Sequence, residues 1–253
     1  MITFAAFYIE LTQQTMAGVH QHTPTVTVTK PYWFMATMFA SATFHHSNCR
    51  RVVLTDQQTL FPAALDCEPI RFDLDPSRPM LARSTAWREF IGQADSHIVF
   101  LDSDMLINAS LDHLFTQSFD VALTYRDDAK WPINAGINFV HGNRLAGGRA
   151  FHTLWLDHFQ QAHDQATIWG GDQDALRDLL NEADFSRHHD FIHTQHGFDI
   201  LLLPCADYNF STADQHGMTG HYPQTKVLHF KGRRKPNMIP YWERYLEDEG
   251  EKG

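Results

Sequence analysis

The sequence has little cysteine and no excess of positive charge. Among 253 residues there are three cysteines, Cys49, Cys67 and Cys205, and their wide spacing excludes a disulfide-rich scaffold. Lysine and arginine number 20 against 30 aspartates and glutamates, which gives a formal net charge of −10 with histidine neutral. A protein that binds DNA or RNA needs a basic surface to neutralise phosphates. We therefore expect no nucleic-acid partner.

Long hydrophobic runs are missing as well, and we expect no secretion leader. The first residues contain no basic segment, and Glu10 follows too early for a signal peptide. The longest uncharged apolar stretch, residues 31–44, is shorter than the roughly 20 residues that a membrane-spanning helix needs. We expect no transmembrane segment and a cytoplasmic location. Peripheral attachment to a membrane through a partner stays open.

Short β-branched runs alternate with longer helical segments along the chain. Residues 51–56 and 97–102 are compact apolar runs that end in polar residues, as buried parallel strands do. Helices are expected at 31–47, 80–93, 146–162 and 172–183. Further strands are expected at 70–74, 121–125, 137–140, 200–203 and 227–230. This alternation predicts an α/β fold with a mostly parallel central sheet.

Two carboxylates, Asp102 and Asp104, end the strongest expected strand, with Ser103 between them. Residues i and i+2 of an extended segment point to the same side, so both carboxylates can face one cation. Ligands of open α/β sheets bind beyond the carboxyl ends of the strands, where this pair would lie. Oxygen ligands suit Mg²⁺ or Mn²⁺, which complete their shells with phosphate oxygens and water. A solvated turn is the alternative for this tripeptide alone.

Two further motifs follow downstream, each ambiguous alone. Asn134 and Gly136 lie about thirty residues on, just before an expected strand, and the glycine allows a ligand to approach the backbone closely. Asp172 and Gln173 open an expected helix and place a carboxylate and an amide near the edge of the same region. Asp172 is also a good N-cap residue, so a purely structural role is the alternative.

The strongest concentration of positive charge lies near the end of the chain. Within residues 229–236, an imidazole and a glycine are accompanied by four cations, Lys231, Arg233, Arg234 and Lys235. In an acidic protein, such a cluster is most simply explained by an anionic ligand, and a diphosphate suits it. A solvated charged loop is the alternative.

Taken together and in this order, the motifs resemble those of the retaining glycosyltransferases of family 8, which have the GT-A fold. That group includes glycogenin-like proteins and bacterial lipopolysaccharide galactosyl- and glucosyltransferases. Its pattern runs Asp-x-Asp, Asn-(Ala/Ser)-Gly, Asp-Gln, Leu-Pro-x-x-(Tyr/Phe)-Asn and His-x-x-Gly-x-x-Lys-Pro. Over residues 80–240 the chain matches this pattern at Asp102, Asp104, Asn134, Gly136, Asp172, Gln173, Leu203, Pro204, Asn209, His229, Gly232, Lys235 and Pro236.

The chain also departs from the family pattern. The tryptophan that often follows Lys-Pro is replaced by Asn237, and the segment 203–209 is one residue longer than usual. The first strand does not match cleanly; residues 26–29 and residues 1–9 are both candidates for it. An aromatic residue beside the nucleotide base is therefore only loosely assigned, to Tyr32 or Phe7.

The resemblance implies a Rossmann-like sheet with helices on both faces and a smaller acceptor-side region, in a single GT-A domain over residues 1–253. Its nucleotide-sugar-binding half would reach to about residue 140, and its acceptor half would cover about 141–245. The implied reaction moves a sugar from a nucleotide donor, most often a UDP-hexose, to a hydroxyl of a carbohydrate, glycolipid or protein acceptor, with retention.

The same resemblance implies the roles of individual residues. Mn²⁺ or Mg²⁺ would be bound by Asp102, Asp104 and His229. Lys235 and the backbone N–H of Gly232 would stabilise the departing diphosphate. The implied donor-binding residues are Arg83 (with Arg88 as the alternative), Asp102, Ser103, Asn134, Gly136, Asn209, Gly232 and Lys235.

Asp172 and Gln173 would lie beside the anomeric carbon as the catalytic pair. Retention could follow from front-face attack, in which the leaving phosphate accepts the proton of the acceptor. It could equally proceed through a covalent intermediate on Asp172. The motifs leave both routes open.

Two other classes of protein remain as alternatives. A sugar-phosphate nucleotidyltransferase would normally carry a glycine-rich basic loop after its first strand, and none follows Phe7 or Val28. A non-catalytic nucleotide-sugar-binding protein of the same fold would not need intact metal and diphosphate motifs.

Histidine is abundant, with 17 residues, and four of them cluster at 188, 189, 193 and 196. His189 and His193 have the i, i+4 spacing of one helix face, so a zinc site is conceivable. No glutamate completes a His-Glu-x-x-His pattern, and we favour surface or acceptor-facing histidines. The stretches 185–196 and 218–222 are expected to line an acceptor cleft.

Overall fold

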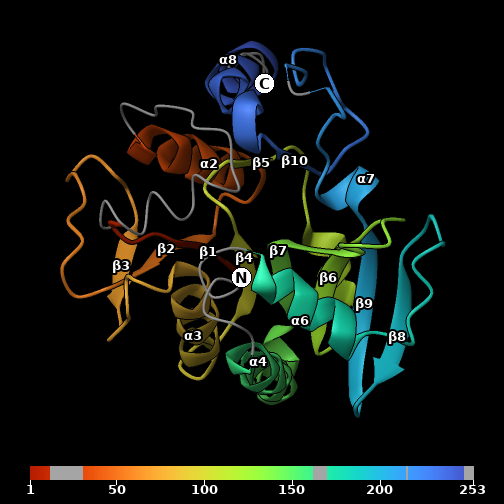
Figure 1. Ribbon diagram of the computed structural model, residues 1–253. Helices are drawn as coiled ribbons and strands as arrows, with labels where there is room; N and C mark the ends of the chain where they lie inside the picture. Colours follow the sequence, from red (N-terminus) through yellow and green to blue (C-terminus); the bar gives the residue numbers. More distant parts are fainter. Residues whose placement is uncertain (12–30, 162–169, 215, 248–253) are drawn as a thin grey trace.

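The computed structural model describes residues 1–11, 31–161, 170–214 and 216–247 (Figure 1). Its centre is an eight-stranded sheet with the order β3-β2-β1-β4-β7-β6-β9-β8. The strands are β1 (Ile2–Phe7), β2 (Arg50–Thr55), β3 (Glu68–Arg71), β4 (His97–Leu101), β6 (Val121–Tyr125), β7 (Ile133–Val140), β8 (Phe191–Gln195) and β9 (Phe198–Pro204). Only β7 and β8 run against their neighbours, so the predicted α/β fold with a mostly parallel sheet is confirmed.

The first strand of the chain occupies the middle of this sheet. β1 lies between β2 and β4, and the chain visits β2 and β3 on one side before it crosses to β4 on the other. This reversal creates a switch point at the carboxyl ends of β1 and β4, where open α/β sheets bind ligands. Of the two candidates for the first strand, residues 1–9 are therefore correct. The other candidate, 26–29, lies outside the described residues.

Helices cover both faces of the sheet. The α-helices are α2 (Pro31–His45), α3 (Pro79–Ile91), α4 (Leu145–Gln160), α6 (Gly171–Leu179), α7 (Cys205–Tyr208) and α8 (Met238–Trp242). Figure 1 shows α2 and α8 on one side of the sheet and α3, α4 and α6 on the other. Strand side chains alternate between the two cores: Phe4 and Ala6 pack with α2, whereas Ala5 packs with α3. Both faces are thus buried, which explains why the central strands are apolar throughout.

The helix α3 places one charged residue in the interior. It begins with Pro79, whose missing N–H has no helical partner to lose at that position. Ala82, Ala86 and Phe90 follow the helical repeat on its buried face. Arg83 lies next to them on the same face, so its guanidinium is carried to the carboxyl end of the sheet rather than into solvent.

A second, smaller sheet extends the carboxyl end of β4. After Asp104 the chain continues as β5 (Met105–Ile107), which pairs antiparallel with β10 (Val227–His229). The backbone N–H of Phe230 donates to the carbonyl of Asp104 at 2.8 Å. This pairing brings the end of β10 against the Asp102–Asp104 segment, although the two are far apart in sequence.

One local expectation and one of the structural alternatives are wrong. Asn134 and Gly136 do not precede a strand but lie within β7, which begins at Ile133; a register shift opposite them in β6 accommodates this part of the strand. Asp172 does not cap α6, because Gly170 holds the N-cap position with a left-handed φ of 78°. Asp172 is therefore free to make contacts other than capping ones.

No helix in the described part of the chain is both long and apolar enough to cross a lipid bilayer. Strands from both expected halves of the chain, up to residue 140 and beyond it, contribute to the same central sheet. The boundary near residue 140 and the extent of a single domain stay predictions.

Candidate active site

Three potential metal ligands meet at the carboxyl end of β4. Asp102 and Asp104 follow this strand, and His229 is the last residue of β10. One ligand atom from each of the three lies within 4.8 Å of the others, and no other such group of His, Cys, Asp or Glu occurs among the described residues. The Nε2 atom of His229 is 3.3 Å from Asp104 Oδ1 and 3.9 Å from Asp102 Oδ2. Two carboxylates and an imidazole at this spacing could together hold a divalent cation.

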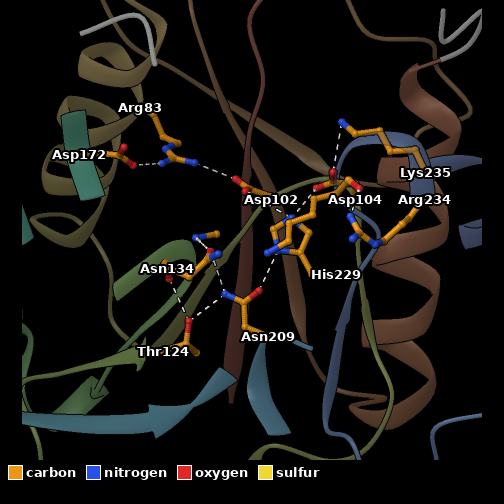
Figure 2. A network of polar contacts seen from close by, with 12 residues as sticks. Arg83, Asp102, Asp104, Thr124, Asn134, Asp172, Asn209, His229, Arg234 and Lys235 are labelled. Carbon is orange, nitrogen blue, oxygen red and sulfur yellow. Dashed lines mark hydrogen bonds and ion pairs between the residues drawn. The ribbon is translucent and has the colours of Figure 1, made fainter. Parts of the chain in front are cut away.

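Positive side chains lie against both carboxylates, but the pKa values of the two aspartates shift in opposite directions. Lys235 Nζ lies 3.2 Å from Asp104 Oδ2 (Figure 2). Burial would raise the pKa of Asp104, but Lys235 and His229 outweigh it and hold the pKa well below its usual value. Burial raises the pKa of Asp102; Arg83 opposes this shift and the charge of Asp104 adds to it. A further cation beside the pair would therefore favour the charged form of Asp102.

Arg83 links the group of Asp102, Asp104 and His229 to Asp172. One terminal nitrogen donates to Asp102 Oδ1 at 2.8 Å, and the other is bound to the Asp172 carboxylate (Figure 2). Burial would lower the pKa of Arg83, but the two carboxylates raise it, so the guanidinium stays charged. Arg88, the alternative arginine, instead pairs with Glu89. Asp172 is 1% exposed, and its backbone carbonyl accepts a hydrogen bond from Trp155.

A chain of buried polar side chains supports His229 from the opposite side. Figure 2 shows Asn209, Asn134 and Thr124 joined by hydrogen bonds, with Asn209 also bonded to the imidazole. These residues come from α7 and its C-terminal cap, β7 and β6. Thr124 was not singled out from the sequence, because a β-branched residue in an apolar strand looks like an ordinary core position.

Two glycines contribute to this arrangement, one through close packing and one through its backbone conformation. A Cβ atom on Gly136 would lie 2.9 Å from His229 Cε1 and 3.0 Å from both Asn134 Oδ1 and Asp102 Oδ2. Gly232 has a left-handed φ of 64° and begins the short helical turn, residues 232–237, that carries Lys235. Gly136 therefore lets β7 pass close to the ligand atoms, whereas Gly232 supplies the left-handed backbone conformation with which the turn begins.

The basic cluster is divided between this site and the protein scaffold. Lys235 reaches Asp104, as described above, whereas Arg234 is buried and donates to the carbonyls of Thr212, Ala213 and Asp214. Arg233 is exposed. Burial lowers the pKa of Lys231, and the nearby Arg126 charge adds to this. Of the four cations expected in this segment, Lys235 therefore contacts the group of Asp102, Asp104 and His229 directly.

Two other predicted residues lie beside the candidate ligands and Asp172. Ser103 and Gln173 are both partly exposed, the first between the two carboxylates and the second next to Asp172 on α6.

At the end of β1, Tyr8 forms an aromatic group with Tyr32 and Phe61, with ring centroids 5.3 to 6.0 Å apart. Phe7 instead packs towards the core on the side of α3. The register pairs Ala6 with Leu101, so this aromatic group lies at the same sheet edge as Asp102.

The histidine cluster does not lie on a helix, despite the i, i+4 spacing of His189 and His193. His193 lies in the edge strand β8, with His189 before it, so the two are not on one helix turn. His193 Nε2 is 2.9 Å from Gln195 Oε1, and His196 Nε2 is 3.0 Å from the carbonyl of Leu179. Alternating exposure along β8 explains the spacing better than a helical repeat.

Solved structures of glycosyltransferases share this architecture. The glycosyltransferase GlyE of Streptococcus pneumoniae TIGR4 matches with a TM-score of 0.56 and 16% identity, over 99% of this chain and 64% of that chain. The galactosyltransferase LgtC, solved with donor and acceptor sugar analogues, matches with a TM-score of 0.53 and 13% identity, over 99% and 100% of the two chains. No protein-family model and no curated protein sequence matches. The protein has the GT-A fold, as the motif resemblance implied.

Proposed function

We propose that the protein is a metal-dependent glycosyltransferase that transfers a hexose from a UDP-sugar to an acceptor hydroxyl with retention. The observation that carries this proposal is the cluster of Asp102, Asp104 and His229 at the carboxyl end of β4 in a GT-A sheet, flanked by Lys235. The three side chains lie where ligands bind in open α/β sheets.

The donor set suits a divalent cation. Two carboxylates and an imidazole match Mn²⁺ better than Mg²⁺, because Mg²⁺ prefers oxygen ligands alone. When bound, such a cation supplies Lewis-acid stabilisation of the negative charge that develops on a leaving diphosphate. Asp102, Asp104 and His229 would hold it, with Ser103 beside the donor.

The charge balance of the site favours an anionic ligand once a cation is held. Asp102, Asp104 and Asp172 face Arg83 and Lys235, which leaves one net negative charge. A divalent cation reverses that sign and makes the site attractive to a diphosphate. Lys235 and the N–H of Gly232 then stabilise the phosphate oxygens through charge and hydrogen bonding.

The sugar would lie between α6 and the group of Asp102, Asp104 and His229. In the proposal, Arg83 and Asn134 hold its hydroxyls, and Asp172 and Gln173 lie beside the anomeric carbon. Front-face attack is favoured over a covalent route, because the Asp172 carboxylate is buried and already paired with Arg83. A glycosyl adduct that forms in the wild type but not in D172N would support the covalent route instead.

The nucleobase would pack against the aromatic group of Tyr8, Tyr32 and Phe61. These rings lie at the end of β1, next to β4 in the sheet, and flat aromatic surfaces stack readily on a base. The acceptor, whether a carbohydrate, a glycolipid or a protein, stays a prediction. A nucleotidyltransferase is less favoured, because no glycine-rich loop follows β1.

The proposal is tested with a panel of UDP- and GDP-sugars, scored for Mn²⁺-dependent release of the nucleotide. We expect turnover of a UDP-hexose in the wild type and a loss of at least about 100-fold in D104N. The matched control is D66N, the same exchange at an aspartate whose side chain is 84% exposed, and it should keep full activity. Wild-type activity that persists in EDTA would rule out the metal assignment. Release of pyrophosphate from a nucleoside triphosphate and a sugar phosphate would support the nucleotidyltransferase instead.

A further inference from the structure

Hydrogen bonds connect Asn134 to Asn209 and Asn209 to His229. The donor and the acceptor of each bond can be assigned by starting from a backbone group that can only donate. The N–H of Gly136 lies 3.0 Å from a side-chain atom of Asn134. A backbone N–H can only donate, so this Asn134 atom must be the amide oxygen. The same oxygen lies 3.0 Å from a side-chain atom of Asn209, which must therefore be the NH₂ group.

A second backbone group fixes the same orientation independently. The hydroxyl of Thr124 donates to the backbone carbonyl of Asn134 at 2.9 Å. With its proton used in this way, Thr124 Oγ1 accepts from the same NH₂ group of Asn209 at 2.8 Å. Both neighbours of that nitrogen are acceptors, so the amide oxygen of Asn209 has to point to the opposite side.

The opposite side of Asn209 faces the imidazole. Its amide oxygen lies 2.8 Å from His229 Nδ1. An amide oxygen only accepts hydrogen bonds, so Nδ1 has to carry the proton. A neutral imidazole with a proton on Nδ1 keeps its lone pair on Nε2, the atom that faces Asp104 and Asp102.

We propose that Asn209 is a positioning residue that locks His229 in the Nδ1–H tautomer and so presents Nε2 as a metal ligand. The family pattern implies a donor-binding role for Asn209, but here the residue is 3% exposed and its amide is engaged by Thr124, Asn134 and His229. The polarity starts at two backbone groups of β7 and passes through two amides to the imidazole. This inference rests on the metal site of the proposed function.

Without Asn209, two changes would favour the Nε2–H tautomer of His229 over the Nδ1–H tautomer. Nδ1 would lose its acceptor, and Nε2–H could donate to the nearby Asp104 carboxylate. Metal binding would then have to break that bond and move the proton. Loss of partners of this kind lowers metal affinity by about 10–100-fold.

The test uses two substitutions of Asn209 and one matched control. N209L keeps the shape but removes the acceptor, whereas N209D keeps an oxygen facing His229. The control is N138L, the same exchange at a fully buried asparagine of β7 that faces His152 rather than the site. Binding of Mn²⁺ alone is measured by calorimetry, and the tautomer of His229 is read from ¹H–¹⁵N NMR spectra of the metal-free protein at pH 9.

We expect N209L to bind Mn²⁺ about 10–100-fold more weakly and to shift His229 towards Nε2–H. N209D should keep the Nδ1–H form and bind Mn²⁺ more tightly than N209L, and N138L should bind like the wild type. Wild-type affinity and tautomer in N209L would overturn the proposal. So would an Nε2–H tautomer in the wild type, a result that does not depend on any variant folding. Because neither readout involves sugar transfer, the positioning role can hold even if the proposed reaction fails, and it can fail while transfer is observed.

Discussion

Lys235 and a metal ion would compete for the Asp104 carboxylate, so a variant without the Lys235 ammonium group is informative. Lys235 Nζ lies 3.2 Å from Asp104 Oδ2, and the other oxygen of the same carboxylate, Oδ1, lies 3.3 Å from His229 Nε2. In the free protein the ammonium neutralises Asp104, so a metal ion has to displace or share this contact. In the complex, Lys235 would instead contact the diphosphate. The variant K235M should therefore change metal binding and nucleotide binding in opposite directions.

The size of the effect follows from the geometry. Two unit charges at this distance interact by about 5 kcal/mol at an effective dielectric constant near 20. The Lys235 side chain is 33% exposed, so screening and side-chain entropy reduce the net value to roughly 1–2 kcal/mol. A difference of about 1.4 kcal/mol corresponds to a tenfold change in affinity.

Calorimetry with Mn²⁺ and then with UDP at saturating Mn²⁺ would separate the two effects. We expect K235M to bind Mn²⁺ alone about tenfold more tightly than the wild type, and to bind UDP about tenfold more weakly. The control R233M removes a charge from an exposed position of the same segment and should change neither affinity by more than about twofold. Unchanged or weaker Mn²⁺ binding in K235M would refute the competition.

Three further outcomes are expected. In G136A the new Cβ would lie 2.9–3.0 Å from atoms of His229, Asn134 and Asp102, so Mn²⁺ affinity should fall at least about tenfold; wild-type affinity would show that the site tolerates the crowding. Burial lowers the pKa of His152 to about 4, below its unfolded value of 6.5. Protonation of the unfolded state therefore removes roughly 3 kcal/mol of the free energy of unfolding as the pH falls from about 6.5 towards 4, and this stability is fully present above about pH 6.5. Urea unfolding of the wild type and H152L at pH 7 and 4.5 should show a steeper loss of stability in the wild type. Parallel losses in the two proteins would contradict this. Replacing Tyr8 by Ala should weaken UDP binding roughly tenfold with little change in Mn²⁺ affinity, whereas an equal loss of both would indicate general damage.

The sequence was sufficient to locate β4 and its carboxylates. An uninterrupted apolar run followed by Asp102 and Asp104 is a strong local pattern, because a strand buried on both faces has to be apolar throughout. The position of Asn134 and Gly136 inside β7 was not predictable in the same way. It depends on a register shift against β6, which is a property of strand pairing and not of either segment alone.

The partly wrong assignments have a common physical cause. His189 and His193 have helical spacing in the sequence, but their segment pairs with β9 as an edge strand, and tertiary pairing overrides local spacing. The aromatic group of Tyr8, Tyr32 and Phe61 joins the end of β1, the start of α2 and the loop after β2, and these segments meet only in the tertiary structure. Thr124 gave no signal because its role depends on a contact with Asn209, far along the chain.

The central claim is that the Asp102, Asp104 and His229 group supports metal-dependent sugar transfer with retention. The most direct measurement is a ¹H NMR time course of a UDP-hexose with Mn²⁺ and the wild-type protein, with D104N in parallel. We predict that the first product has the same anomeric configuration as the donor and that D104N forms none. An inverted product, equal turnover by D104N, or no turnover of any nucleotide sugar would contradict the account.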